Sequence, residues 1–364
     1  MHFRGNHLTV SIFGQSHAPA IGAVIEGLPA GFKVDQARLQ AFMSRRAPGQ
    51  GKFTTARKEA DAPEFLSGLT DGVTCGAPVC AVIKNGDTRS KDYETFRQIP
   101  RPSHADYPAL VKYGDAYDIR GGGQFSGRLT APLCVAGGIA LQILETRGIR
   151  IGAHIASVSN QTDRRFDPVR VSAADFDQIA ANGFPTLSRE AGEDMLAVIE
   201  EARKAEDSVG GTVEAAAIGL PAGLGGPLFD GLESALAAAC FGIPAVKGVE
   251  FGDGFFAALL KGSQHNDAYA MDHGKVVTKT NHAGGLAGGM TTGMPLILRV
   301  AFKPTPSIGQ AQQSVNLKEG TETQLVIKGR HDPCVVPRAV PVVEAAVALV
   351  LLDTILSETG KETD

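Results

Sequence analysis

The segment that most constrains how this chain can fold is its C-terminal apolar stretch, residues 336–357. It has the composition of a long helix that is apolar on nearly every side, with Arg338, Pro341 and Glu344 in its first turns. A helix without a polar face must be buried, so we expect it to lie between layers of secondary structure. Its most apolar part, residues 345–352, is far shorter than the roughly 20 residues that span a membrane. We therefore expect no membrane segment.

Residues 23–31 and 215–223 form a repeat in which an apolar strand runs into Gly-Leu-Pro-Ala-Gly. In both copies an acidic residue follows at a predicted helix start, Asp35 in the first and Asp230 in the second. So short a match can arise by chance, but the shared strand–turn–helix context favours an internal duplication. The copies are too far apart for a solenoid. We expect one domain, residues 1–364, made of two related halves, roughly 1–150 and 200–364, that share a core.

Apolar periodicity predicts the remaining elements. One predicted helix begins at Asp35. Two others cover residues 130–146, which are rich in small side chains, and residues 188–207. Predicted strands cover residues 8–13, 21–26, 78–83, 149–158 and 324–328. The stretch 101–127 is polar and glycine-rich, with little periodicity.

Composition excludes several classes of protein. The 44 glycines among 364 residues have no period of three, so the chain is not collagen-like. With 43% hydrophobic and 20% charged residues, it is too apolar for a disordered chain. Its net charge of −4 lacks the basic character that nucleic-acid binding requires. What remains is a globular protein with more glycine than average, and the location of that glycine becomes the question.

The cysteines indicate neither a disulfide framework nor a metal centre. Their number is odd and their spacing matches no zinc motif; they are Cys75, Cys80, Cys134, Cys240 and Cys334. The first ten residues contain no long apolar core, so we expect no signal peptide. Reduced thiols and a cytoplasmic location are the expectation.

His17 lies in the first of four glycine-rich polar clusters, residues 13–17. Its imidazole follows a predicted strand on a glycine-flanked turn, where catalytic groups are often presented. The alternative is a solvent-exposed turn histidine, and the residues alone leave both interpretations open.

The second cluster, residues 44–52, is rich in cations and follows the helix predicted to begin at Asp35. Arg45, Arg46 and Lys52 could simply complement the helix dipole. They could equally clamp a phosphate or carboxylate, because a guanidinium group supplies two parallel donors.

The third cluster combines residues 101–107 with the glycine-rich stretch 120–128. Residues 122–128 are spaced like a P-loop, but Arg128 stands in place of the lysine and Leu129 in place of the hydroxyl residue. We therefore do not expect nucleoside triphosphate binding. Anion binding by glycine amides at a helix N-terminus remains open.

The fourth cluster, residues 329–334, lies between the last predicted strand and the C-terminal helix. Asp332 precedes a proline there and could be no more than a helix-entry residue. Residues 303–307 add a rigid, hydroxyl-bearing loop. Taken together, the clusters place cations, His17, His104 and Asp332 in glycine-rich turns of a net-acidic chain. This pattern favours a small, multiply anionic substrate and proton transfer.

Three groups of motifs, in order along the chain, resemble the signature regions of the chorismate synthase family. The first is Gly-Gln-Ser-His at 14–17 with Gly-Leu-Pro at 27–29, and the second is Arg-Pro-Ser-His-Ala-Asp at 101–106 with the loop 121–128. The third is Gly-Arg-His-Asp-Pro at 329–333 with Arg338, Ala339 and Glu344. Further matches at 245–248, 281–285 and the Lys303 loop extend the resemblance over nearly the whole chain.

The resemblance implies a reaction and its catalytic residues. Members of this family convert 5-enolpyruvylshikimate 3-phosphate to chorismate by a 1,4-anti elimination of phosphate, and they need reduced FMN although no net redox change occurs. By this resemblance His17 protonates or stabilises the reduced flavin, and His104 protonates the departing phosphate. Asp332 takes a proton from flavin N5. Histidine suits such roles because both of its protonation states are accessible near neutral pH.

The resemblance also implies two sets of binding residues and no metal. The cations that neutralise the carboxylates and phosphate of the substrate are Arg46, Lys52, Arg101, Arg128 and Arg338. The residues that hold FMN are Gln124, Phe125, Ser126, Gly288, Lys303, Pro304, Thr305, Pro306, Ser307 and Arg330.

The fold implied by the resemblance is an α+β sandwich with helices layered between two antiparallel sheets and an internal pseudo-twofold repeat. The implied assembly is a homotetramer. Some relatives reduce their own flavin with NADPH, and these are often longer. At 364 residues we expect dependence on an external flavin reductase, with NADPH a cofactor only if the chain reduces its own flavin.

Several positions depart from the usual motifs of the family. The most prominent lie in the loop after Gly123, where Gln124 removes a cation, Phe125 a hydroxyl group and Leu129 a carboxylate. Phe125 could instead add an apolar wall. Lys52 also stands where arginine is more common. Because His17, His104 and Asp332 are all present, we expect an active enzyme. The alternative is a non-catalytic flavin- or anion-binding relative.

Overall fold

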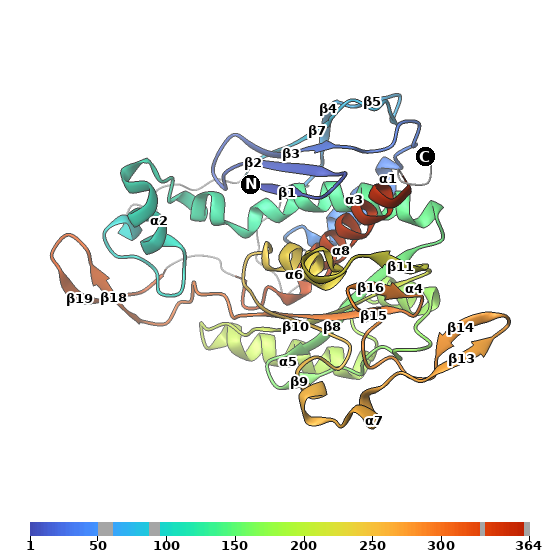
Figure 1. Ribbon diagram of the computed structural model, residues 1–364. Coiled ribbons are helices and arrows are strands. Elements are labelled where there is room, and N and C mark those ends of the chain that lie inside the picture. The colour runs from blue at the N-terminus through green and yellow to red at the C-terminus, as the bar shows by residue number, and fades with distance from the viewer. Residues whose placement is uncertain (50–60, 87–94, 328–331, 360–364) are drawn as a thin grey trace.

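Two antiparallel five-stranded sheets enclose a layer of helices in the computed structural model, which describes residues 1–49, 61–86, 95–327 and 332–359 (Figure 1). The first sheet has the order β1-β2-β3-β7-β4 and the second β12-β17-β10-β8-β9. The first sheet consists of β1 (His2–Arg4), β2 (Thr9–Gly14), β3 (Ala20–Glu26), β4 (Glu64–Ser67) and β7 (Val79–Lys84). The second consists of β8 (Arg150–Val158), β9 (Gln161–Thr162), β10 (Gly211–Ile218), β12 (Val246–Phe251) and β17 (Leu296–Phe302).

The helical layer is formed by α1 (Gln36–Arg46), α3 (Thr130–Thr146), α6 (Leu232–Phe241) and α8 (Val336–Thr359). Helix α3 packs on β3 and β7 of the first sheet, α8 packs on β8 and β10 of the second, and the two helices pack against each other. Helices α4 (Ala173–Ala181) and α5 (Arg189–Lys204) cover the outer side of the second sheet (Figure 1). The apolar C-terminal helix therefore lies between layers, as predicted.

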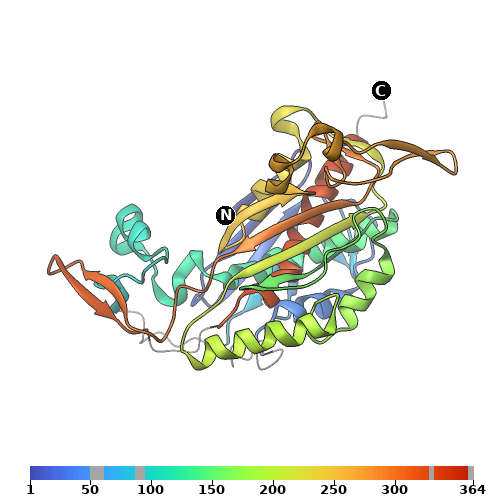
Figure 2. The same ribbon diagram turned by 90° about the horizontal axis from the view of Figure 1, so that it is seen from below.

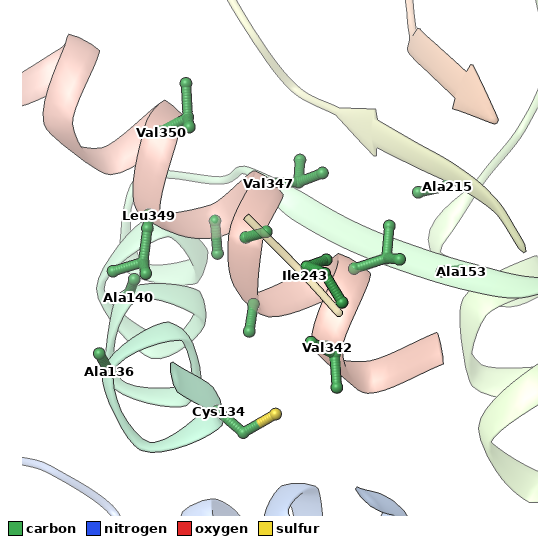
Figure 3. Close-up of a cluster of buried hydrophobic side chains, with 14 of the residues drawn as sticks. Cys134, Ala136, Ala140, Ala153, Ala215, Ile243, Val342, Val347, Leu349 and Val350 are labelled. Carbon is green, nitrogen blue, oxygen red and sulfur yellow. The ribbon is translucent and has the colours of Figure 1, made fainter. Parts of the chain in front are cut away.

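The close approach of α3 and α8 depends on small side chains in α3. A Cβ atom added to Gly137 would lie 2.2 Å from the Cβ of Ala345 in α8, so only glycine fits there. Figure 3 shows the surrounding core, with Cys134, Ala136 and Ala140 of α3 on the side of α8 that carries Leu349. Tight packing of this kind maximises dispersion contacts, and it explains why residues 130–146 are rich in small residues.

The remaining elements are short strands and helices, several of which project from the sandwich. They are α2 (Asp106–Tyr113), α7 (Gly262–His265), β5 (Leu69–Thr70), β6 (Val73–Thr74), β11 (Ala222–Gly225), β13 (Tyr269–Asp272), β14 (Lys275–Thr278), β15 (Leu286–Ala287), β16 (Met290–Thr292), β18 (Gln312–Asn316) and β19 (Thr321–Leu325). Both ribbon views show the β18–β19 hairpin and α2 at one end of the molecule and the β13–β14 hairpin at the other (Figures 1 and 2).

The two sheets repeat one topology. The chain order β2, β3, α1, β4, β7, α3 is matched by β8, β10, α6, β12, β17, α8, with the same strand neighbours in each sheet. The turn after the repeated strand carries the same hydrogen bonds: Thr74 Oγ1 donates to the carbonyl of Pro29 (2.6 Å), and Thr291 Oγ1 donates to that of Pro221 (2.6 Å). The predicted α+β sandwich with an internal repeat is confirmed.

Most predicted elements are present, and Asp35 caps α1 by accepting a hydrogen bond from the Arg38 amide (2.9 Å). Asp230 is not a helix cap, because it ends a 3-10 turn and α6 begins after Gly231 with no side-chain cap. The strand predicted at 324–328 is β19, which ends at Leu325 because its register is set by pairing with β18. Helix α2 was missed within the polar stretch 101–127. Its Ala109 is buried in a small apolar cluster with Phe96.

Two core helices, Gly127–Thr146 and Val336–Glu358, are long and apolar enough to cross a membrane by length and composition. The second is much longer than the apolar stretch 345–352 considered above, because alanine, valine and isolated polar residues extend the apolar segment. The most apolar windows of these helices are 78% and 94% buried within the protein, as core helices are. All five cysteines are free thiols, as expected.

Candidate active site

A cavity of about 1630 Å³ opens where the end of α1, the start of α8 and several glycine-rich loops meet. Among the residues that line it are Arg46, Arg101, His104, Gln124, Phe125, Ser126, Arg128, Lys303, Thr305, Pro306, Ser307, Asp332 and Arg338. These residues are distant in sequence, so the fold has gathered three of the four predicted clusters at one place. Pockets for a single small ligand usually measure about 300–1,000 Å³, and this cavity has room for more than one.

The glycine turn 121–123 lies against both predicted catalytic histidines. Its residues have φ values of 61°, 82° and 54°, a left-handed backbone that favours glycine. A Cβ added to Gly121 would lie 2.8 Å from His17 Nε2, and one added to Gly122 would lie 3.4 Å from His104 Nε2. The absence of side chains therefore lets the two imidazoles, which are far apart in sequence, approach the same turn.

His104 and Arg101 share the carboxylate of Asp106, which is fully buried. His104 Nδ1 lies 2.8 Å from Asp106 Oδ1, and Arg101 donates to Asp106 through Nε (2.7 Å) and Nη2 (2.8 Å). Burial raises the pKa of Asp106, but the hydrogen bonds from Arg101 and His104 lower it by more, to well below its usual range. Asp106 is therefore an anion that fixes two cavity-lining side chains.

Arg46 and Arg128 are joined by a second buried carboxylate, Asp61. Arg46 Nη1 lies 2.8 Å from Asp61 Oδ2, and Arg128 Nη1 is bonded to Asp61 Oδ1. Arg46 also donates through Nε to Thr130 Oγ1 (3.0 Å) and through Nη2 to the Gly127 carbonyl (2.8 Å). Burial and the nearby charge of Arg338 lower the pKa of Arg46 to about 10. Both causes disfavour the charged form of the guanidinium, and an anion bound nearby would favour it.

Arg338, in the first turn of α8, pairs through Nη1 with Asp332 and donates from Nε to the Arg46 carbonyl (3.0 Å). Behind this pair, Glu344 holds Arg45 through two hydrogen bonds of 2.6 and 2.8 Å. Three arginines and two carboxylates thus meet at one wall of the cavity; we call this set the site cluster, and its members are Arg46, Arg128, Arg338, Asp61 and Asp332. An additional anion would balance it.

Four residues of the loop 303–307 also line the cavity, namely Lys303, Thr305, Pro306 and Ser307. Lys303 Nζ donates to the Ser103 carbonyl (2.5 Å) and contacts Ser103 Oγ (2.9 Å), which ties this loop to the loop that carries His104. Burial and the charge of Lys247 lower the pKa of Lys303. Within the described residues, Thr305 Oγ1 is buried without a hydrogen-bond partner. A buried polar group in that state is suited to a ligand that supplies the missing partner.

Phe125, one of the departures from the family pattern, is 40% exposed and lines the cavity. Its ring packs edge-on against Tyr117, with centroids 5.9 Å apart, and lies 6.4 Å from Tyr113. The substitution of a hydroxyl residue by phenylalanine thus gives an apolar wall next to Gln124 and Ser126. This is the wall that the sequence suggested as one possibility.

Not every predicted site residue is among those that line the cavity. Gly288 lies in the exposed turn between β15 and β16, and His17 and Pro304 lie beside lining residues without being among them. Lys52 and Arg330 fall outside the described residues, so the structure gives no position for either. Within the residues that the structure describes, no group of three or more His, Cys, Asp or Glu side chains could hold a metal ion.

Three polar residues of the site were not identified from the sequence. The sequence analysis included Asp106 only as a member of the motif 101–106. No motif around Asp61 or Asn85 indicated that either belongs to the site. Asn85 accepts from Arg128 Nε (3.1 Å) and donates to the Ala18 carbonyl (2.7 Å), so it links the site cluster to the turn that carries His17. The contacts of Asn85 join residues that are tens of positions apart, so no spacing along the chain reveals them.

Comparison with known proteins agrees with this geometry. A sequence profile of the family described as chorismate synthase matches residues 8–356. The chain is 48% identical to the chorismate synthase of Lancefieldella parvula, covering 97% of this chain and 96% of the relative. It is 49% identical to that of Thermococcus gammatolerans, covering 99% of each. A crystal structure of chorismate synthase superimposes with a TM-score of 0.78 at 27% identity, covering 98% of this chain and 94% of the other.

Proposed function

The chain belongs to the chorismate synthase family and is a lyase that eliminates phosphate from 5-enolpyruvylshikimate 3-phosphate to form chorismate; we propose that it does so in the cavity described above. The observation that carries this proposal is the meeting of His104, Asp332 and four arginines at one cavity. The residue roles given below are our proposal.

The arginines are proposed to hold the three anionic groups of the substrate. Arg46, Arg128 and Arg338 outnumber the carboxylates of their cluster by one, and Arg101, paired with Asp106, also lines the cavity. Their guanidinium groups supply donors for the two carboxylates and the phosphate. Because the donors are fixed by buried partners before the substrate arrives, they stabilise charge that develops on the departing phosphate without having to reorganise. We propose that Lys52 contributes a further cation.

The described residues also fit a flavin mononucleotide. The cavity has room for a second ligand beside the substrate, and its wall offers Thr305 Oγ1, a buried hydroxyl that lacks a partner within the described residues. When bound, reduced FMN would supply the electron-rich ring that assists loss of phosphate with no net redox change. The residues proposed to hold it are Gln124, Phe125, Ser126, Gly288, Lys303, Pro304, Thr305, Pro306, Ser307 and Arg330.

Two further side chains are proposed to transfer protons. His104 lines the cavity beside Arg101, where a proton on its outer nitrogen can reach the phosphate oxygen of a bound substrate. Asp332 lies on the arginine wall, held by Arg338, as a carboxylate that can accept a proton. His17 is buried against Gly121 and is proposed to stabilise negative charge on the bound cofactor.

The test is an anaerobic assay of the purified protein with substrate and chemically reduced FMN. We expect equal amounts of phosphate and chorismate to be formed. The alternative, a non-catalytic flavin- or anion-binding relative, predicts FMN binding that does not tighten when substrate is added, and no product. Parallel reactions with NADPH and with dithionite test the proposed dependence on an external flavin reductase. Turnover in air with NADPH alone would contradict it.

We also propose a cytoplasmic homotetramer, built from single-domain chains with two related halves. Large apolar side chains exposed on several elements of this chain support an assembly, since interfaces between subunits bury such side chains. They include Leu228, Phe229, Phe255, Phe256, Leu259 and Tyr269. Light scattering coupled to size-exclusion chromatography measures the mass of the assembly. A monomer at micromolar concentration would contradict the proposal.

A further inference from the structure

One buried carboxylate, that of Asp106, accepts hydrogen bonds from four nitrogen atoms. Three belong to Arg101: the backbone amide (3.1 Å), Nε (2.7 Å) and Nη2 (2.8 Å). The fourth is His104 Nδ1, 2.8 Å from Asp106 Oδ1. Asp106 is completely buried at the start of α2, where the helix dipole also favours a negative charge. It does not line the cavity, so it acts on the substrate only through Arg101 and His104.

These contacts decide which nitrogen of His104 carries the proton in the neutral ring. Nδ1 has two neighbours: Asp106 Oδ1, an acceptor, at 2.8 Å, and Arg101 Nη2, a donor, at 3.3 Å. Arg101 Nη2 already donates to Asp106 Oδ1 at 2.8 Å. The shorter contact favours a hydrogen on Nδ1 that is donated to the carboxylate, because an unprotonated Nδ1 and an anionic oxygen at 2.8 Å would repel each other. Nε2 is then the nitrogen that exchanges a proton with a ligand.

The other end of the ring lies against the glycine turn. A Cβ at Gly122 would lie 3.3 Å from His104 Cε1 and 3.4 Å from Nε2. Glycine at this position leaves the Nε2 end of the ring uncrowded beside the cavity that His104 lines. Asp106 on one side and the glycine turn on the other therefore set both the proton position and the direction of the imidazole.

We propose that Asp106 is a positioning residue that fixes His104 with its Nδ1–H donated to the carboxylate, so that Nε2 delivers a proton to the departing phosphate. The proposal rests on the function proposed above. As the carbon–oxygen bond to phosphate breaks, its electron pair stays on the phosphate oxygen, which takes the proton from Nε2. The ring is left neutral with one hydrogen on Nδ1. A carboxylate that orients a catalytic imidazole in this way is a recurring arrangement in unrelated enzymes.

The competing explanation is that Asp106 only holds Arg101 and the start of α2. The two explanations differ in what happens to His104. A purely structural role predicts no fixed tautomer of His104. A positioning role predicts that the neutral imidazole carries its hydrogen on Nδ1 in the resting protein, and that this preference is lost when the carboxylate of Asp106 is replaced.

The first measurement is ¹⁵N NMR of histidine-labelled protein without substrate or cofactor, with H104Q used to identify the signal. In the neutral ring of the wild type we expect the hydrogen on Nδ1. A neutral ring with its hydrogen on Nε2 overturns the proposal, whether or not any variant folds. This measurement does not depend on turnover, so it stands even if the chorismate assay of the wild type fails.

The second measurement compares D106N with R101M, which removes Arg101 but keeps the Asp106–His104 pair. In D106N the new side chain keeps the shape of the carboxylate, but its amide nitrogen cannot accept from Nδ1–H. We therefore expect a mixed or reversed tautomer and a kcat lowered by about 10²-fold, in the usual range for general acid catalysis. R101M should keep the Nδ1–H tautomer and mainly raise KM. An unchanged tautomer in D106N, or a loss confined to KM, overturns the proposal.

Discussion

Two clusters of buried charged side chains among the described residues differ in charge balance and in what they face. The site cluster holds three arginines against two carboxylates and lines a cavity. The second set lies in the second sheet, and none of its members lines that cavity. We call it the sheet cluster; it comprises His154, Asp163, Glu214, Glu250 and Arg299.

Every carboxylate of the sheet cluster has partners within the protein. Glu214 accepts from His154 Nε2 (3.0 Å) and from the Phe166 amide (2.8 Å). Asp163 accepts from the amides of Leu187 (2.5 Å) and Ser188 (3.0 Å). Arg299 completes the network by donating to Glu250 (2.6 Å) and to the Gly252 carbonyl (2.6 Å).

The comparison shows that burial of charge does not by itself indicate a binding site. In the sheet cluster three carboxylates face one arginine and one histidine, and backbone amides fill further acceptor positions, so the network fastens neighbouring strands together. Among the described residues, the site cluster has one more arginine than it has carboxylates and lies beside an open cavity, where burial and the charges of Arg338 and Arg128 lower the pKa of Arg46 to about 10. Such a cluster can accept an anionic substrate. The following variants test this division, beginning with the largest expected effect.

Glu214→Gln should destabilise the protein strongly, because breaking a buried ion pair by removing one partner costs about 3–5 kcal/mol. The charge lost here faces both His154 and Arg299. Denaturant unfolding at matched protein concentration measures the change. The control is Glu200→Gln, which removes an exposed pair with Arg203 on α5 and should change the free energy of unfolding by at most about 1 kcal/mol. Equal losses in both variants would mean that the sheet cluster is not a structural network.

Arg338→Met should lower kcat/KM by about 10²–10³-fold, the usual loss on removing one preorganised donor from a developing charge. Arg338 is anchored by the Arg46 carbonyl and Asp332, so its loss removes a donor without opening the core. The matched control is Arg299→Met in the sheet cluster. It should lower Tm while kcat/KM per folded molecule stays unchanged. The division between the clusters fails if the two variants lose activity equally.

Inorganic phosphate should raise the Tm of the wild type by binding to the site cluster. Ligand at a hundredfold excess over Kd stabilises the folded state by about 2.7 kcal/mol. Arg128→Gln should lose most of this shift, since Arg128 supplies one of the three cations. Arg299→Gln should melt at lower temperature yet keep the full shift with phosphate. Scanning fluorimetry of the three proteins decides between a local anion site and general ionic stabilisation.

The pH dependence of stability should come mainly from the sheet cluster and is the smallest of these effects. Burial lowers the pKa of His154, but its hydrogen bonds with Asp163 and Glu214 raise it by more, above its ordinary value of 6.5. A raised folded-state pKa gives stability that is complete below 6.5 and is lost as the pH rises through the folded-state value. Urea midpoints between pH 6 and 9 should fall in the wild type. His154→Gln should flatten that slope, and an unchanged slope would contradict this assignment.

Local patterns predicted α1, α3, α5 and α8 and the strands β2, β3, β7, β8 and β10, but not β12 and β17 of the second sheet or helix α4. The helix at 130–146, the cap at Asp35 and the strand before each Gly-Leu-Pro-Ala-Gly turn all depend on residues that are close in sequence. The buried position of α8 followed from the absence of a polar face on that helix. Helix α2 was not predicted because it is short and polar, and its buried Ala109 depends on contacts with residues such as Phe96, outside the helix.

The sequence by itself determined the two related halves, the buried C-terminal helix, and the motifs that identify the family, because periodicity and residue order are local properties. Only the tertiary structure decided which carboxylates hold which cations. Asp61 bonds Arg46 and Arg128, and Glu344 holds Arg45. Such pairings depend on distances between elements that the packing of two sheets and four helices brings together, and no spacing along the chain encodes them. The chemistry of the site was therefore visible in the sequence, while its geometry arose from the fold.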